Sequence, residues 1–296
     1  MKIKRWLMVI RAPFLLLPIV LAFLGTCIAW YDGVFHLGHA LLAFFGLLLA
    51  HISVNVLNEY FDYRSGVDLK TQRTPFSGGS GALPMGLISP GQALWLGLGT
   101  FIAIIPIGIY FTITIGWLLL PLLLIAAACI ILYTPFILKM GWPEWAPGIG
   151  LGALPVLGAY FIQTGDYTVP AIIASVPSGI LVHNLLLINE FPDVEADVTV
   201  KRRTLPIAIG KGKASIVYSV LTGMVYLWTL GGVLAGQMPP FTLIALLTLP
   251  FAVKAIRGAI NYNDPSKLIP GLANNILVVL VTQLLLGIGY ILAGVF

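Results

Sequence analysis

Two short segments of the chain combine acids and bases in a pattern that suits metal and phosphate chemistry. The second segment, 189–206, reads NEFPDVEADVTVKRRTLP and carries four acids followed by three adjacent bases. Asp193 and Asp197 are four residues apart, so helical geometry places both carboxylates on one face, where unpaired anions repel each other. A divalent cation would remove that repulsion, and Mg2+ prefers one or two carboxylates together with substrate phosphates. The segment therefore predicts a site for a metal-bound polyanion.

The same pattern occurs earlier, in residues 55–75, which read NVLNEYFDYRSGVDLKTQRTP. As in the second segment, an Asp follows an Asn by four residues, here Asp62 after Asn58. The second acid is less regular, because Asp68 lies six residues after Asp62, and the intervening Gly66 could turn the chain so that Asp68 still reaches the site. We expect the two acid clusters to face each other and to hold two metal ions on one diphosphate, an arrangement that stabilises a leaving oxyanion.

Basic residues near both motifs predict how the remaining phosphate charge is neutralised. Guanidinium and ammonium groups pair well with phosphate oxygens, and the Gly/Ser-rich run 73–81 could bring backbone N–H groups to an anion. A flexible connector is the alternative for this run, and a side chain that reaches the lipid headgroups is the alternative for Arg11 and Lys139. The residues predicted to bind the diphosphate are two amides and six bases: Asn58, Asn189, Arg11, Arg73, Lys139, Lys201, Arg202 and Arg203.

Composition places these motifs in a membrane protein. Hydrophobic residues make up 59% of the 296 and charged residues 9%, whereas about a quarter of the residues of soluble domains are charged. We expect an all-α polytopic protein with one domain, 1–296, made of two related units, about 1–140 and 141–296. Because a span needs about 20 apolar residues, nine transmembrane helices around a central cavity are predicted, at roughly 13–31, 35–58, 91–112, 115–138, 146–164, 168–189, 214–236, 239–260 and 269–294.

The distribution of charge gives this bundle an orientation. With nine spans, all 16 Lys and Arg residues fall on the side of the N-terminus and of the two acid motifs, and the other side has only Asp32 and Asp166. Basic loops stay in the cytoplasm, so we expect a plasma-membrane protein with a cytoplasmic cap that holds both motifs. The net charge of +5 follows from this topology and does not indicate a nucleic-acid partner. Cys27 and Cys129 lie in apolar runs and indicate neither a disulfide nor a zinc site.

With both motifs described, the chain resembles the UbiA superfamily of intramembrane prenyltransferases over nearly its whole length. The matching motifs are N-x3-D-x5-D at 58–68, D-x3-D at 193–197, KRRTL at 201–205 and YTPFILK at 133–139. The form of the first motif, NEYFDYRSGVD, and the run RTPFSGGSGALPMGLIS are similar to those of the menaquinone branch, the 1,4-dihydroxy-2-naphthoate prenyltransferases. Glu59 and Gly66 depart from the common NDxxDxxxD form of that motif.

The resemblance implies a reaction, a fold of nine helices and a set of site residues. A polyprenyl group would pass from its diphosphate to an aromatic acceptor, with two Mg2+ ions holding the diphosphate at the membrane surface. Asp62, Asp193, Tyr133 and Lys139 would be catalytic, with the ring of Tyr133 facing the allylic cation. The metal ligands would be Asn58, Asp62, Asp68, Asp193 and Asp197.

Two alternatives remain open at the level of the sequence. The same chemistry could act on 4-hydroxybenzoate or on a glycerol-phosphate lipid precursor instead of a naphthoate. A membrane transporter that uses the acids as gates is an alternative of another class. Transporters usually place such groups near the bilayer midplane on broken helices, whereas these acids lie at helix ends on one side, so the enzyme is favoured.

Overall fold

Helices make up the secondary structure of residues 2–296, the part of the chain that the computed structural model describes, and no strand occurs in that range. Eight helical segments are long and apolar enough to cross a membrane. The all-α membrane class is therefore confirmed, and eight of the nine predicted spans are matched. These segments are Ala12–Tyr31, Leu37–Ser65, Pro90–Thr114, Trp145–Thr164, Val169–Asn189, Lys211–Leu234, Pro240–Ile260 and Pro265–Val295.

The ninth predicted span, 115–138, corresponds to a shorter helix, α5 (Leu119–Leu132), of 14 residues. The chain turns before it, at Gly116 and Trp117, and Pro135 follows its end, so regular helix is confined to the apolar run between them. The remaining residues of the predicted span form turns and the 3-10 helix η3 (Ile137–Lys139).

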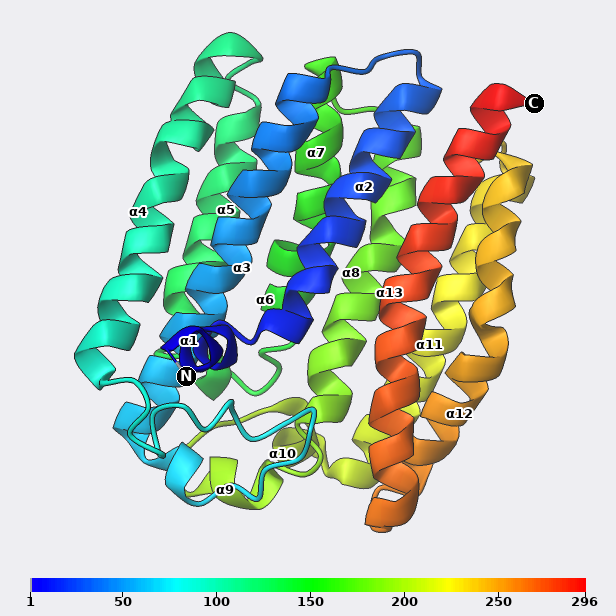
Figure 1. Ribbon diagram of the computed structural model, residues 1–296. Helices are drawn as coiled ribbons and strands as arrows, with labels where there is room; N and C mark the ends of the chain where they lie inside the picture. The colour runs from blue at the N-terminus through cyan, green and yellow to red at the C-terminus, as the bar shows by residue number, and fades with distance from the viewer. Residues whose placement is uncertain (1) are drawn as a thin grey trace.

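Eight helices form most of the bundle, and α5 lies at one side of it, next to α4 (Figure 1). Neighbours in space include α3 with α4, α2 with α7, α8 with α11, and α12 with α13. Among the close approaches, Gly258 faces Gly271, where a Cβ on Gly258 would lie 2.5 Å from the other glycine's Cα. The bounds are α2 (Leu16–Tyr31), α3 (Leu37–Ser65), α4 (Pro90–Thr114), α7 (Leu154–Thr164), α8 (Val169–Asn189), α11 (Lys211–Leu234), α12 (Leu249–Ile260) and α13 (Pro265–Val295).

Shorter helices extend or cap these segments. The 3-10 helix η1 leads into α2. The helix α6 is followed by the π-helix η4, which leads into α7, and η5 leads into α12. The helix α1 lies across the bundle instead of along it (Figure 1), and the small helices η2, α9 and α10 belong to the segments around the acid motifs. Their bounds are α1 (Lys2–Val9), η1 (Ala12–Leu15), η2 (Val67–Leu69), α6 (Trp145–Gly148), η4 (Ile149–Ala153), α9 (Val194–Val198), α10 (Leu205–Ile209) and η5 (Pro240–Thr248).

Two features of the N-terminal half differ from the sequence prediction. α1 was not predicted as a separate helix; its apolar side chains Ile3 and Leu7 are exposed and alternate with bases, which is typical of a helix lying in the membrane interface. Helix α3 also continues seven residues beyond the predicted end at 58, to Ser65. No helix breaker interrupts it before Gly66, which ends it with a positive φ of 80°.

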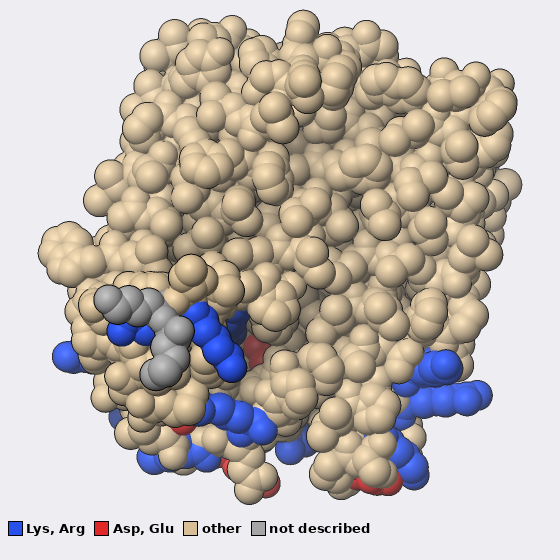
Figure 2. Space-filling model, viewed as in Figure 1, with Lys and Arg blue, Asp and Glu red and all other residues tan. Residues whose placement is uncertain are grey.

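Charged side chains gather at one end of the molecule on the face shown in Figure 2, and the rest of that face is uncharged. The charged end is where α9, α10 and the loop between α3 and α4 lie (Figure 1). The largest buried cluster, which includes Leu21, Tyr160, Leu181 and Val278, joins the central helices. The fold therefore presents a polar rim at one end of an apolar bundle.

Candidate active site

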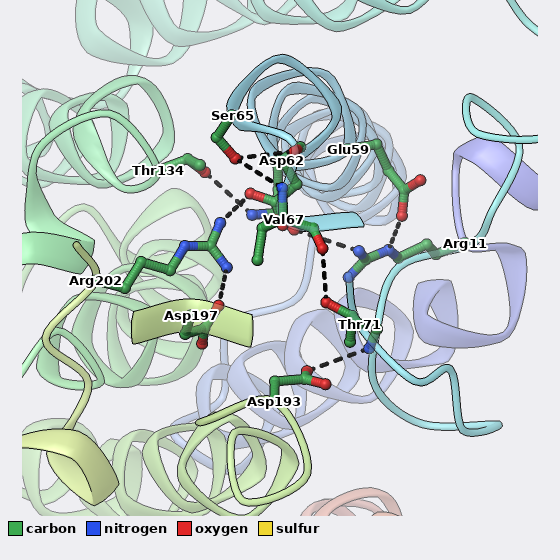
Figure 3. A network of polar contacts seen from close by, with 12 residues as sticks. Arg11, Glu59, Asp62, Ser65, Val67, Thr71, Thr134, Asp193, Asp197 and Arg202 are labelled. Atoms are coloured by element: carbon green, nitrogen blue, oxygen red, sulfur yellow. Dashed lines mark hydrogen bonds and ion pairs between the residues drawn. The ribbon is translucent and has the colours of Figure 1, made fainter. Parts of the chain in front are cut away.

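The two acid motifs meet at the polar rim, on either side of Arg202 (Figure 3). Arg202 Nη1 lies 2.8 Å from Asp197 Oδ1, and Arg202 Nη2 pairs with Asp62 Oδ1. The arginine side chain is 13% exposed, and those of Asp62 and Asp197 are 9% and 4% exposed. Residues from α3 and α9, far apart in the sequence, therefore lie close enough to share one cation.

The second motif follows a break in the helix. Helix α8 ends at Asn189, and Pro192 lies in the turn that follows, where it has no N–H to continue the helix. Asp193 then begins α9, and the N–H of Asp197 donates to the carbonyl of Asp193 at 2.9 Å. The two carboxylates are thus separated by one helical turn, as their spacing predicts.

The first motif lies mostly on a helix and not in a loop. Asn58 was predicted at the end of the second span and Asp62 beyond it, and both belong to the last turns of α3. Gly66 then reverses the chain, and Asp68 lies on η2, where it is only 5% exposed. The predicted turn at Gly66 is present, and it leaves Asp68 buried among the other acids.

A second ion pair fixes the first motif from the other side. Arg11 Nε lies 2.7 Å from Glu59 Oε1, and its Nη2 donates to Asn58 Oδ1 at 3.3 Å. Asn58 in turn donates to the hydroxyl of Thr134, at 3.1 Å. Arg11 adopts a left-handed backbone, with φ of 52°, at the corner between α1 and η1. Glu59 therefore holds Arg11 beside the acids instead of facing them itself.

The Gly/Ser-rich run folds over the acids. The N–H of Gly78 donates to Asp193 Oδ2 at 3.2 Å, and both the N–H and the hydroxyl of Ser80 donate to Glu59 at 2.7 Å. At Gly79, a Cβ would lie 3.0 Å from Asp68 Oδ1. The loop thus contacts acids of both motifs through backbone N–H groups and glycines, as expected for a cover over an anion site.

Several oxygens of the two motifs are buried without a hydrogen-bond partner among residues 2–296: Asp68 Oδ2, Asn189 Oδ1 and Asp193 Oδ1. Burial, together with the neighbouring carboxylates of Asp62 and Asp197 respectively, raises the pKa of Asp68 and of Asp193 to about 7. Negative charge at this site is therefore incompletely compensated by the protein. Carboxylate and amide oxygens are hard ligands of the kind that Mg2+ prefers.

The acids do not form a complete metal cage in the described part of the chain, where no group of three or more His, Cys, Asp and Glu side chains is arranged to hold an ion. Arg202 instead spans Asp62 and Asp197, and Gly78 bonds to Asp193. Mg2+ often takes only one or two carboxylates when phosphates and water complete its shell. The residues therefore fit Mg2+ that binds together with a diphosphate.

The bases predicted to bind the diphosphate fall into two groups. Arg11 and Arg73 line a cavity of about 410 Å³ next to the loop that covers the acids, and Arg202 lies between the motifs. The other three have exposed side chains that form no ion pair within residues 2–296: Lys139, Lys201 and Arg203. The structure places Arg11 and Arg202 beside the acids, whereas Arg73 lines the cavity but is itself exposed and forms no ion pair within residues 2–296, and the second group stays at the surface.

Tyr133 lies at the end of α5, 8% exposed, close to the acids. Burial raises the pKa of its phenol well above the ordinary value, with Glu190 and Glu144 adding to the effect. The ring is therefore neutral at physiological pH. Glu144 is fully buried and accepts a hydrogen bond from the N–H of Leu205 at 2.7 Å. It could not be identified from the sequence, because it is a single Glu outside any motif.

An apolar cavity of about 360 Å³ extends along α3 away from the motifs. On α3 its lining runs from Ala43 to His51, seven residues before Asn58. Its wall also includes side chains of α4 and α5 that are exposed on the outer surface, such as Ile109 and Leu124. The cavity therefore opens on the membrane-facing side of those two helices.

Known proteins of one family resemble this chain over most of its length. The model of the UbiA prenyltransferase family matches residues 15–292. A 1,4-dihydroxy-2-naphthoate octaprenyltransferase of Bacillus subtilis is 30% identical over 249 residues, which is 83% of this chain and 79% of that protein. A digeranylgeranylglyceryl phosphate synthase of Thermococcus kodakarensis is 27% identical over 232 residues, 75% of this chain and 76% of that protein.

Among solved structures, a UbiA homolog from Archaeoglobus fulgidus bound to GPP and Mg2+ has the same fold, with a TM-score of 0.62. It is 13% identical in sequence, and the match covers 93% of this chain and 99% of that one. The family model covers most of the chain, and both the sequence relatives and this fold agree with it. The chain is therefore a prenyltransferase that belongs to the UbiA family.

Proposed function

We propose that the protein transfers a polyprenyl group from its diphosphate to an aromatic acceptor, with 1,4-dihydroxy-2-naphthoate as the acceptor and Mg2+ as the cofactor. One observation carries the proposal: acids from two distant motifs share Arg202 at the polar rim, above an apolar cavity. The rim suits a diphosphate and the cavity suits a hydrocarbon tail. The name of the Bacillus subtilis relative supports the naphthoate and hence a role in menaquinone biosynthesis.

The residues of the rim would divide the work of holding the diphosphate. Asn58, Asp62, Asp68, Asp193 and Asp197 would hold two Mg2+ ions, and Asn189 would face the diphosphate. When bound, Mg2+ would neutralise the diphosphate oxygens as negative charge develops on them. Among the bases, Arg11 and Arg73 beside the cavity and Arg202 between the motifs would pair with the remaining oxygens.

The reaction breaks the carbon–oxygen bond of the donor, and the electron pair leaves with the diphosphate. A ring carbon of the acceptor forms the new carbon–carbon bond, and the ring loses a proton or, from a carboxylated naphthol, CO2. The neutral ring of Tyr133 would face the allylic cation through its π-electrons, and the apolar wall excludes the water that would quench it. Lys139 would have to swing inward to contribute.

We also propose that the chain crosses the membrane nine times, with α5 in addition to the eight longer segments, and that both motifs lie in the cytoplasm. The two chain ends lie toward opposite ends of the bundle (Figure 1), which needs an odd number of crossings. The bases cluster on the side of the motifs, as basic cytoplasmic loops do. In this arrangement the two related units, 1–140 and 141–296, each supply one acid motif.

The test is a product measurement with the purified protein in lipid nanodiscs. A polyprenyl diphosphate and Mg2+ are supplied with 1,4-dihydroxy-2-naphthoate, 4-hydroxybenzoate or a glycerol-phosphate lipid precursor, and the products are identified by mass. We expect a prenylated product only with the naphthoate, together with pyrophosphate and CO2. A product only with another acceptor would reassign the substrate, and the Thermococcus kodakarensis relative makes the glycerol phosphate the first to try. Ion or phosphate flux into vesicles without pyrophosphate release would favour a transporter.

Asp193→Asn tests the acid cluster in the same assay. The amide keeps the size of the side chain but removes a half-buried carboxylate that accepts one hydrogen bond within residues 2–296, from the N–H of Gly78. We expect the rate to fall at least about a hundredfold, the scale of losing one electrostatic contact to the leaving group. The matched control is Glu195→Gln, an exposed acid of the same helix. Full Mg2+-dependent turnover by Asp193→Asn would refute the metal assignment.

A further inference from the structure

His51 is a polar side chain in the wall of the apolar cavity. It lies on α3 and is only 3% exposed. Its position, seven residues before Asn58, places it within about 20° of the same helix face and about 10 Å along the axis from the motif. His51 is thus the lining residue of α3 that lies nearest to the acids.

The hydrogen bonds of His51 determine which ring nitrogen carries the proton. Nδ1 lies 3.0 Å from the carbonyl oxygen of Leu47. A carbonyl can only accept a hydrogen bond, so Nδ1 carries the hydrogen and Nε2 of the neutral ring offers a lone pair. Nε2 is buried and has no partner among residues 2–296. The cavity wall therefore contains one buried acceptor whose bond is not made within the protein.

An unpaired hydrogen-bond acceptor is unfavourable in a cavity that holds only hydrocarbon. Buried polar atoms are normally paired, because leaving one unpaired costs free energy. Thr112, another polar residue of the wall, follows that rule and donates its hydroxyl to the carbonyl of Gly108 at 2.8 Å. The unpaired Nε2 instead suits a ligand that brings a hydroxyl or N–H donor into the apolar space.

Its depth indicates which ligand that is. The diphosphate end of the prenyl substrate belongs at the rim, and its hydrocarbon tail cannot donate a hydrogen bond. A hydroxylated aromatic ring must lie beside the first carbon of the tail, between the diphosphate and the apolar wall. His51 lies about 10 Å from Asn58 along the axis of α3, which is the depth at which such a ring would lie.

We propose that His51 binds the aromatic acceptor, with Nε2 accepting a hydrogen bond from a ring hydroxyl. This inference rests on the proposed function, since it assumes a hydroxylated ring as the second substrate. The bond orients the ring so that its reactive carbon faces the donor. Recognition then depends on the hydroxyl and on the apolar wall around it.

The test compares two variants in steady-state kinetics with 1,4-dihydroxy-2-naphthoate and a polyprenyl diphosphate. His51→Phe keeps a planar ring and removes the acceptor nitrogen, and His51→Gln restores an acceptor oxygen at similar reach. We expect His51→Phe to raise the KM for the acceptor about ten- to a hundredfold, the effect of leaving a buried hydroxyl unpaired. The KM for the donor should stay within twofold, and His51→Gln should recover part of the loss.

Ser53→Ala is the matched control, because Ser53 is a buried polar residue of the same helix outside the cavity wall, and its hydroxyl donates to Gly97 O at 2.9 Å. Both KM values should be unchanged in this variant. If His51→Phe leaves the acceptor KM unchanged, or raises the donor KM instead, the inference is wrong while the function stands. If the unmodified protein makes no prenylated ring at all, the proposed function itself fails.

Discussion

Arg202 is the side chain on which the two motifs converge. It is the one cation that an ion pair joins to both motifs within residues 2–296, through Asp62 and Asp197. Desolvation alone would lower the pKa of its guanidinium, yet the adjacent carboxylates raise the pKa above its ordinary value. Arg202 is therefore the counter-ion of the acid cluster, and under the proposed function it would pair with the diphosphate when the acids hold Mg2+.

Removing this arginine should destabilise the metal-free protein. In Arg202→Ala, Asp62 and Asp197 lose a shared partner while they stay buried, which costs about 3 kcal/mol for a broken buried pair. The measurement is the thermal unfolding midpoint in detergent with a chelator, which should fall clearly below that of the unmodified protein. Arg203→Ala, at an exposed neighbouring side chain, should leave it unchanged. Equal midpoints for both variants would contradict this role.

At the scale of residues, acids in repeated motifs could be predicted, but their partners could not. The spacing of Asn58, Asp62, Asp193 and Asp197 by four residues follows directly from helical geometry. The pairing of Ser80 with Glu59 depends on how a loop folds back, which no local pattern encodes. His51 likewise belongs to no sequence motif, and its unpaired nitrogen becomes evident only beside the cavity.

At the scale of elements, the loop between α3 and α4 contains glycines at positions where an added side chain would displace neighbouring atoms. At Gly81 a Cβ would lie 1.9 Å from Arg73 Nη1, the far end of a flexible side chain. The φ of Gly86, 66°, is similar to that of Gly81, 78°, but a Cβ on Gly86 would have no neighbouring atom within 4 Å. The two positions share the same backbone strain and differ in their contact with Arg73.

Gly81→Ala should therefore push the guanidinium of Arg73 away from the mouth of the site. We expect the KM for the diphosphate donor to rise about tenfold, the effect of weakening one charge-assisted hydrogen bond. Gly86→Ala should show the same small loss of stability from strain and no change in that KM. The prediction is wrong if both variants bind the donor alike.

The pair α12 and α13 gives a second prediction at this scale, for stability alone. In Gly258→Ala the new methyl group would lie 2.5 Å from the Cα of Gly271, so the helices must separate. Overpacking of this kind costs about 1–3 kcal/mol. Gly223→Ala, in α11 with no atom within 4 Å, should instead be stabilising by up to about 1 kcal/mol, because Ala favours helix. Thermal unfolding in detergent should shift in opposite directions for the two variants.

The helices could be predicted from their apolar runs, while their ends could not. Long runs such as 269–294 predicted α13 within a few residues. The polar last turns of α3 belong to the helix because no breaker occurs before Gly66, although their composition resembles a loop. α1 was missed because a short amphipathic helix is stabilised by the membrane surface and not by its own sequence.

At the scale of the whole molecule, the charge pattern predicts which end faces the cytoplasm. Glu195 on α9 and Asp166 before α8 are both exposed, and they lie on opposite sides in the proposed topology. With Cys27 and Cys129 replaced by Ala, Glu195→Cys should react with an impermeant thiol reagent only after the cells are opened. Asp166→Cys should react in intact cells. Reaction of both from the same side would overturn the nine-span topology.

Composition was sufficient to predict a helical membrane bundle, because 59% hydrophobic residues in long runs leave few other folds. The convergence of the motifs was inferred from their repetition, and the bundle brings them together. The neighbours in the bundle, such as α2 with α7, could not be derived, since any apolar face can pack against another in lipid. The position and opening of the cavity depend on those pairings and became known only from the fold.

The arginine bridge described above has a consequence for the order of events in turnover. While Arg202 occupies the space between the two carboxylates, free divalent ions compete with a cation that is covalently part of the chain and hence never diffuses away. Under the proposed function, a diphosphate that carries its own Mg2+ would give the guanidinium a new anionic partner in place of the two carboxylates. We therefore expect the rate to follow the concentration of the metal–donor complex instead of that of total magnesium.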